Sequence, residues 1–211
     1  MRNSLEGQCA TRVRVAIVPL LFTSIAAIVL LSSAAQAADT NTATAVARAE
    51  SCSALSAADF TSIEDAPTQV TASREIGHVE RTIGKVPPHC RVEGYVSPNV
   101  GFVLWLPPAT EWNGKFIQMS LGGYGGSTSS RAPWCEETLR RGYACLTHDT
   151  GHSGWPSRAS WAYNNLQAEF DYGIRGHYVA ALAGKALTEH YYGSAPEYSY
   201  HFGCSGGGKQ G

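Results

Sequence analysis

The sequence predicts an α/β fold, a sheet flanked by helices, and three observations support this prediction. Strand-like and helix-like segments alternate along the second half of the chain. A glycine run, Gly122–Gly126, directly follows one predicted strand. A second small-residue run, Gly203–Gly208, follows another predicted strand. Glycines at strand ends allow the sharp turns that connect sheet and helices in such folds.

The first predicted strands are 91–97 and 102–106, with Pro98 and Asn99 in the turn between them. Residues 115–119 form a third, and the three together suggest an antiparallel meander. The second strand should end at Pro107, because proline cannot donate a hydrogen bond to the ladder.

The alternation begins after the third strand. A helix is predicted over 136–141, stopped by Gly142, and a buried strand over 143–147. Apolar residues then recur at helical spacing between Phe170 and His190, with Gly193 as the stop. The segment 197–202 is strand-like and leads into Ser205.

Gly203, Ser205 and Gly207 fit G-x-S-x-G, the nucleophile-elbow pattern of α/β-hydrolases. A serine that presents its hydroxyl from a sharp strand-to-helix turn needs very small neighbours. The alternatives are a Gly/Ser-rich linker and a phosphate-binding turn, although Lys209 is followed by Gln210 rather than by the Ser or Thr of a P-loop. The pattern also requires a downstream acid and His. Because the sequence stops at Gly211, we expect a fragment that lacks the C-terminal half of the sheet.

An elbow serine also needs an oxyanion hole, made by two backbone N–H groups. In α/β-hydrolases one comes from the residue after the serine, here Gly206, and the other from a loop after an early strand. The Gly122–Gly126 loop fits the second role, with Gly123 the preferred donor and Gly122 the next. The alternatives for this loop are an ordinary flexible turn and a phosphate-cradling loop.

The stretch His148–His152 has the H-x-x-x-H spacing of a zinc motif. It lies at a strand end, however, and Asp149 stands where that motif has glutamate, so we predict no metal in this part of the protein. Asp149 and His152 are instead expected to hydrogen-bond backbone near the rim of the site. His177, His190 and His201 are not predicted as the catalytic base. The five tryptophans are either core residues or the lining of an aromatic pocket.

The N-terminus predicts export. Arg12 and Arg14 precede an apolar run, 15–31, and Ala35-Gln36-Ala37 fits a cleavage site, so residues 1–37 are interpreted as a signal peptide and 38–211 as the truncated catalytic domain. A membrane anchor is the alternative, which Pro19 and the polar residues of the run weaken. The expected location is secreted or periplasmic, with no stable membrane insertion after signal removal.

Charge and cysteines limit the partners. A formal net charge of −1 with no basic patch argues against nucleic acid. Without Cys9, five cysteines remain in a chain predicted to enter an oxidising compartment. Cys52 and Cys90 are the most plausible pair, Cys135 with Cys145 is a weaker suggestion because spacing does not give connectivity, and Cys204 is left with a partner beyond residue 211.

Several motifs, in order, resemble the tannase and feruloyl esterase family over nearly all of the predicted mature chain. They are Cys90-Arg91-Val92-Glu93-Gly94, Leu106-Pro107-Pro108 with Trp112-Asn113-Gly114-Lys115-Phe116, Gly122–Gly126, Gly142-Tyr143-Ala144 before Asp149-Thr150-Gly151-His152, and Tyr200–Gly211. One departure is Lys209, where the family often has arginine.

The resemblance implies a secreted serine carboxylesterase with an α/β-hydrolase fold, a lid domain inserted after the elbow, and Ser205 as nucleophile. It implies a disulfide from Cys204 to the cysteine before the catalytic His. The implied substrates are small or polysaccharide-linked esters of phenolic acids, including the monoester released from a polyester plastic. No cofactor is implied for catalysis, and a structural calcium belongs to the lid. A chain without the lid, the acid and the His should be inactive.

Two other interpretations remain open. One is a non-catalytic secreted module that binds glycans or aromatic groups through its tryptophans. The other is a lipase-like or peptidase-like α/β-hydrolase. A Cys-His pair and a preceding Asp in the downstream sequence would favour the esterase.

Overall fold

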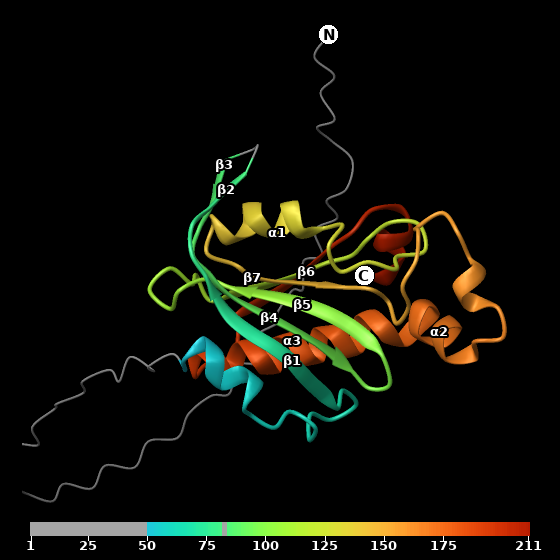
Figure 1. Ribbon diagram of the computed structural model, residues 1–211, viewed down its shortest axis with the longest axis horizontal. Coiled ribbons are helices and arrows are strands. Elements are labelled where there is room, and N and C mark those ends of the chain that lie inside the picture. Colours follow the sequence, from blue (N-terminus) through green and yellow to red (C-terminus); the bar gives the residue numbers. More distant parts are fainter. Residues whose placement is uncertain (1–49, 82–83) are drawn as a thin grey trace, which may run out of the picture. The chain divides into compact units, whose positions relative to one another are not determined.

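The computed structural model describes residues 50–81 and 84–211, so the predicted signal peptide lies outside the described residues. Six strands form one mixed sheet in the order β1-β4-β5-β7-β6-β8 (Figure 1). The strands are β1 Thr68–Ile76, β4 His89–Val96, β5 Val100–Leu106, β6 Lys115–Met119, β7 Ala144–His148 and β8 Tyr198–Phe202. A separate two-stranded hairpin is made by β2 Val79–Arg81 and β3 Gly84–Val86.

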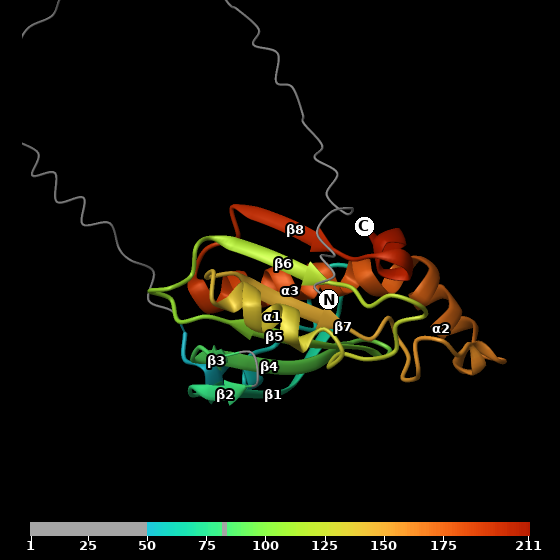
Figure 2. The same ribbon diagram turned by 90° about the horizontal axis from the view of Figure 1, so that it is seen from above.

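The sheet has an antiparallel half and a parallel half. Strands β1, β4, β5 and β7 pair antiparallel, whereas β6 runs parallel to both β7 and β8. Figure 2 shows β1 and β8 at opposite edges. Parallel neighbours need a crossover connection, and helices supply it between β6 and β7 and between β7 and β8.

The predicted meander is therefore wrong for its third strand. The strands at 91–97 and 102–106 are neighbours as expected, but β7 inserts between β5 and β6, with Leu104 opposite Leu146 and Gln118 beside Leu146. All five residues of β7 are buried, as is typical of a central strand covered on both faces.

Helices cover both faces of the sheet. Alternate residues of β5 point to opposite sides. Leu104 packs in the cluster that contains Ala183 of α3 (Gly176–Tyr192), and Trp105 packs in the one that contains Leu139 of α1 (Ala132–Leu139). Figure 1 shows α1 and α3 on opposite sides of the sheet. This layering confirms the predicted α/β class.

The helix predicted between Phe170 and His190 is part of a longer run. It begins with α2 (Leu166–Phe170), capped by the Asn165 side chain, passes through a π-helical turn (Asp171–Arg175) and continues as α3. Gly193 ends it with a φ of 72°, as predicted. The described residues also form three 3₁₀ helices, Cys52–Ser56, Ser160–Ala162 and Ser205–Gln210.

Two disulfides link helices to strands of the sheet. Cys52 bonds Cys90 and so ties the first 3₁₀ helix to β4, and Cys135 bonds Cys145 and ties α1 to β7. Both suggested pairs are therefore present. Within the described part of the chain, no helix has the length and apolar character needed to span a bilayer.

Candidate active site

The turn after β8, Gly203–Gly207, has the geometry of a nucleophile elbow. Ser205 has a φ of 55°, which is rare for a non-glycine residue and costs about 1–3 kcal/mol. Its side chain is exposed, and the 3₁₀ helix Ser205–Gln210, here called the elbow helix, begins at this residue. The strand therefore ends with the serine raised on a strained turn.

The flanking glycines are a steric requirement. A Cβ on Gly203 would lie 2.3 Å from the Gly207 carbonyl oxygen, and a Cβ on Gly207 would lie 2.7 Å from the Ser120 carbonyl oxygen. Real Cβ atoms do not approach backbone atoms so closely, so neither position accepts a larger residue without movement of the turn. The small flanks that the motif predicts are needed for backbone packing.

The glycine loop lies directly against the elbow. A Cβ on Gly206 would lie 2.1 Å from the Gly123 oxygen and 2.9 Å from the Gly123 nitrogen, and one on Gly122 would lie 3.9 Å from the Ser205 Cβ. The structure therefore brings Gly206 and Gly123, separated by 83 positions in the sequence, to within backbone contact beside the serine.

Both predicted donors have N–H groups outside the regular backbone ladders. The first intrahelical bond of the elbow helix is donated by Gly207 to the Cys204 carbonyl, so Gly206 precedes it. No hydrogen bond from the Gly123 N–H occurs among the residues that the structure describes. Chemically, two such groups beside a serine hydroxyl suit the stabilisation of a developing oxyanion.

The glycine loop is fastened to the segment that follows β7. Tyr124 N–H donates to the Pro156 carbonyl at 2.8 Å, and Gly126 N–H donates to the Asp149 carbonyl at 3.0 Å. The loop is thus held by backbone bonds rather than being an ordinary flexible turn.

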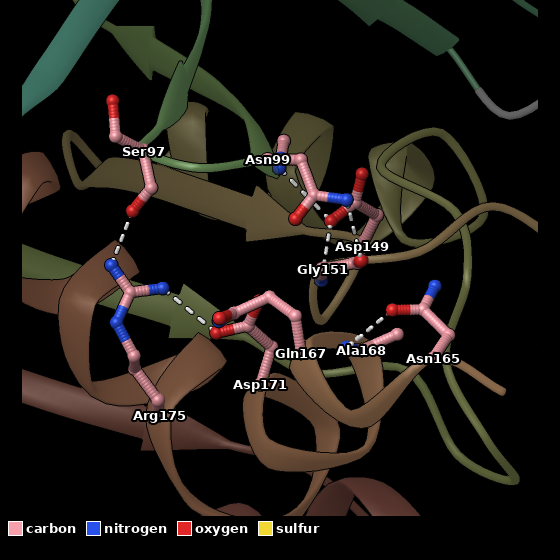
Figure 3. Close-up of polar contacts among 10 residues, drawn as sticks. Ser97, Asn99, Asp149, Gly151, Asn165, Gln167, Ala168, Asp171 and Arg175 are labelled. Atoms are coloured by element: carbon pink, nitrogen blue, oxygen red, sulfur yellow. Dashed lines mark hydrogen bonds and ion pairs between the residues drawn. The ribbon is translucent and has the colours of Figure 1, made fainter. Parts of the chain in front are cut away.

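The Asp149 side chain hydrogen-bonds the backbone of this segment at Gly151 (Figure 3). Its Oδ1 accepts the N–H groups of Gly101 at 3.0 Å and Gly151 at 2.8 Å, which agrees with the backbone role expected for it. Burial raises the pKa of the Asp149 carboxyl to about 7, although the two N–H donors lower it. Asp171, fully buried, forms an ion pair with Arg175 at 2.7 Å nearby.

A buried polar group lies under the elbow. The Ser120 hydroxyl is 3.2 Å from His148 Nε2 and 2.9 Å from His201 Nε2. Burial, together with the charges of His177 and His201, lowers the pKa of His148 to about 3. No described residue hydrogen-bonds the Ser205 hydroxyl, so none of these histidines is placed as its base.

The model of the family described as tannase and feruloyl esterase matches residues 82–211, a stretch that contains both the glycine loop and the elbow. The chain belongs to the tannase and feruloyl esterase family. Its fold is that of an α/β-hydrolase.

Relatives agree with the family assignment. An uncharacterized esterase of Xanthomonas campestris pv. campestris is 37% identical over 128 residues, which are 59% of this chain and 22% of that protein. The mono(2-hydroxyethyl) terephthalate hydrolase of Piscinibacter sakaiensis is 29% identical over 163 residues, which are 68% of this chain and 27% of that protein. The chain thus spans about a quarter of the length of these curated relatives.

A solved structure supports the fold. Tannin acyl hydrolase from Aspergillus niger superposes with a TM-score of 0.58 at 21% identity, covering 76% of this chain and 33% of the other. At this identity the likeness bears on the fold alone.

Two features of this chain could not be predicted from the sequence. Ser120 follows β6 and joins two histidines, but a lone serine gives no pattern. Tyr172 contacts the glycine loop from the π-helical turn, and helical periodicity does not reveal such a turn. Among the described cysteines only Cys204 has no disulfide partner, as expected from the sequence.

Proposed function

We propose that this chain carries the nucleophile and oxyanion hole of a serine carboxylesterase that hydrolyses esters of phenolic or other aromatic acids. The observation that carries the proposal is the exposed, strained Ser205 with Gly206 and Gly123 packed beside it. A hydroxyl in this position next to two backbone donors suits acyl transfer.

The reaction proceeds in two steps. The Ser205 Oγ attacks the ester carbonyl carbon while a His takes its proton, and the N–H groups of Gly206 and Gly123 hold the oxyanion. The intermediate collapses, the alcohol leaves with the proton from the His, and an acyl-enzyme remains. Water, deprotonated by the same His, then attacks the acyl carbonyl and releases the acid and the free serine.

The His and its acid partner lie in polypeptide beyond residue 211, which also contains the lid domain. The length of the curated relatives supports this part of the proposal. Exposed apolar side chains on the segment after β7, such as Trp155 and Leu166, provide surface for that polypeptide to cover. We call this chain together with the downstream polypeptide the complete enzyme.

Residues 1–37 act as a signal peptide, and the protein functions in the periplasm or outside the cell. The disulfides Cys52–Cys90 and Cys135–Cys145 support an oxidising compartment. Cys204 bonds the cysteine that precedes the catalytic His, which would hold nucleophile and base together.

Aromatic acid esters are the preferred substrate class. Relatives carry the names feruloyl esterase B and mono(2-hydroxyethyl) terephthalate hydrolase, both of which specify esters of aromatic acids. Polysaccharide-linked esters belong to the same class. Assays with feruloyl, galloyl and terephthaloyl esters of matched alcohols would rank these acids.

Replacing Ser205 by Ala in the complete enzyme should lower turnover on the order of 10⁶-fold. Ser194→Ala, at an exposed serine between α3 and β8, is the matched control and should retain full activity. Substantial activity in the Ser205 variant would reject the assignment. The 211-residue chain alone should be inactive, and labelling of its Ser205 by a fluorophosphonate probe would contradict the proposed location of the base.

A further inference from the structure

Tyr172 contacts both the glycine loop and the elbow helix. Its hydroxyl donates a hydrogen bond to the Gly123 carbonyl at 3.2 Å. The ammonium nitrogen of Lys209, on the elbow helix, lies 3.8 Å from the centre of the Tyr172 ring. A single side chain therefore connects the glycine loop to the helix that begins at Ser205.

The hydrogen bond to Gly123 completes a clamp on one peptide group. The carbonyl of the Gly123–Tyr124 peptide accepts from Tyr172, and its N–H donates to the Pro156 carbonyl at 2.8 Å. Gly123 has a φ of +62°, and glycine by itself has wide conformational freedom. Fixing the peptide after Gly123 anchors one side of the Gly123 Cα and so limits how far the Gly123 N–H can move.

Lys209 gives the second connection. An ammonium over a tyrosine ring is attracted by the negative face of the ring. Because Lys209 lies about one turn beyond Ser205, this contact joins Tyr172 to the elbow helix rather than to a distant part of the fold.

Tyr172 is itself held firmly. It belongs to the π-helical turn, a feature that often occurs at functional sites. Its ring centre lies 5.2 Å from that of Trp161, and Trp161 stacks on His152 at 3.8 Å. The preceding residue, Asp171, is fully buried and paired with Arg175.

We propose that Tyr172 is a positioning residue for the oxyanion hole, holding Gly123 through its hydroxyl and the elbow helix through its ring. This inference rests on the proposed function. It predicts that loss of the hydroxyl weakens transition-state stabilisation and leaves ground-state binding of the ester intact, because the hydroxyl acts on Gly123 rather than on the substrate.

The test compares Tyr172→Phe with Tyr178→Phe in the complete enzyme. Tyr178 lies in the same helical run, and its hydroxyl contacts Asp65 at 3.4 Å, so the control removes an equivalent hydroxyl elsewhere. Tyr172→Phe should lower kcat about tenfold with KM changed less than twofold, a smaller loss than that of an oxyanion donor itself. Tyr178→Phe should change neither constant.

A second measurement tests the oxyanion hole separately from substrate turnover. An aryl trifluoromethyl ketone adds to the nucleophile and forms a hemiketal whose oxygen occupies the oxyanion position. Its inhibition constant should rise about tenfold in Tyr172→Phe, in parallel with the fall in kcat. Lys209→Met should shift both quantities in the same direction by a smaller factor.

An unchanged kcat, a raised KM alone, or a lower kcat without weaker ketone binding would overturn the role of Tyr172. These outcomes differ from failure of the proposed function. In that case Ser205→Ala would remain active and the ketone would not inhibit the unmodified complete enzyme.

Discussion

The antiparallel half of the sheet and the elbow region are built in different ways. In β4 and β5, apolar side chains such as Val92 and Leu104 are fully buried and fill a continuous core. Around Ser205 the contacts are made by backbone against backbone, and an added Cβ would collide at Gly203, Gly206 and Gly207. The first region owes its stability to apolar burial, and the second depends on the absence of side chains.

The two regions also differ in whether their buried polar side-chain atoms have hydrogen-bond partners. Among the described residues, every buried side-chain polar atom without a partner belongs to the part after β6: His148, His152, Trp161, His177 and Gln210. Most large exposed apolar side chains lie there too, including Trp155, Tyr163 and Ile174. The comparison teaches that the described residues up to β6 leave no buried side-chain polar atom without a partner, whereas the part after β6 has surface and polar groups that suit further contacts.

Among the variants that test this comparison, the largest expected effect is on the glycine contacts. Gly206→Ala places a Cβ 2.1 Å from the Gly123 oxygen, so the glycine loop must move. We expect a loss of about 10²–10³-fold in kcat of the complete enzyme, comparable with loss of an oxyanion donor. Gly173→Ala is the control, since a Cβ there meets nothing within 4 Å and should leave kcat unchanged. Equal behaviour of the two variants would contradict the steric role of Gly206.

A pair of leucines sharpens the contrast in stability. Leu104 is fully buried in β5, and Leu166 at the start of α2 is 80% exposed. Leu104→Ala should lower the free energy of unfolding of the 211-residue chain by about 2–5 kcal/mol. Leu166→Ala should change it by less than about 0.5 kcal/mol. Urea denaturation of both variants measures this difference, and a similar cost for the two would show that the core is not centred on β5.

The two disulfides are also expected to contribute unequally to the free energy of unfolding. Cys52 and Cys90 are 38 positions apart in sequence, and Cys135 and Cys145 are 10 apart. By loop-closure entropy, removing the first bridge through paired Ala substitutions should cost at most about 4 kcal/mol, and removing the second about 3 kcal/mol. Denaturation of the two double variants tests this order. A reversed order would mean that strain or residual structure outweighs chain entropy.

The pH dependence of stability is the smallest expected effect, when it is expressed per pH unit. Burial raises the pKa of Asp149 to about 7 in the folded state, above its ordinary value of 3.8. The folded protein therefore holds this proton more tightly, and the Asp149 contribution to stability is lost as pH rises from about 4 to about 7. The slope is at most about 1.4 kcal/mol per pH unit.

Asp149→Asn isolates this contribution, because both N–H donors bond Oδ1, which an asparagine retains. His148 acts in the opposite direction, since its lowered pKa of about 3 removes stability as pH falls below about 6.5. The informative quantity is therefore the difference in unfolding free energy between variant and parent chain. Between pH 4 and pH 7, Asp149→Asn should become progressively more stable relative to the parent chain. A difference that stays constant over this range would refute the raised pKa.

The features that could be predicted from the sequence are those set by interactions between residues close together in the chain. The strand before Ser205, its small flanks and the glycine loop are local patterns, and their close contact agrees with the hydrolase pattern. The insertion of β7 between β5 and β6 depends on long-range pairing, which the spacing of short strands does not encode. The π-helical turn was hidden for a similar reason, because its apolar spacing resembles that of an ordinary helix.

The central claim, that Ser205 is the nucleophile, is tested most directly by trapping the acyl-enzyme. The complete enzyme would be mixed with a slowly hydrolysed aryl ester, quenched in acid, digested and analysed by mass spectrometry. We predict the aroyl group on the peptide that contains Ser205 and its absence from that peptide in the Ser205→Ala variant. An aroyl group on a different residue, or continued turnover by the variant, would contradict the account.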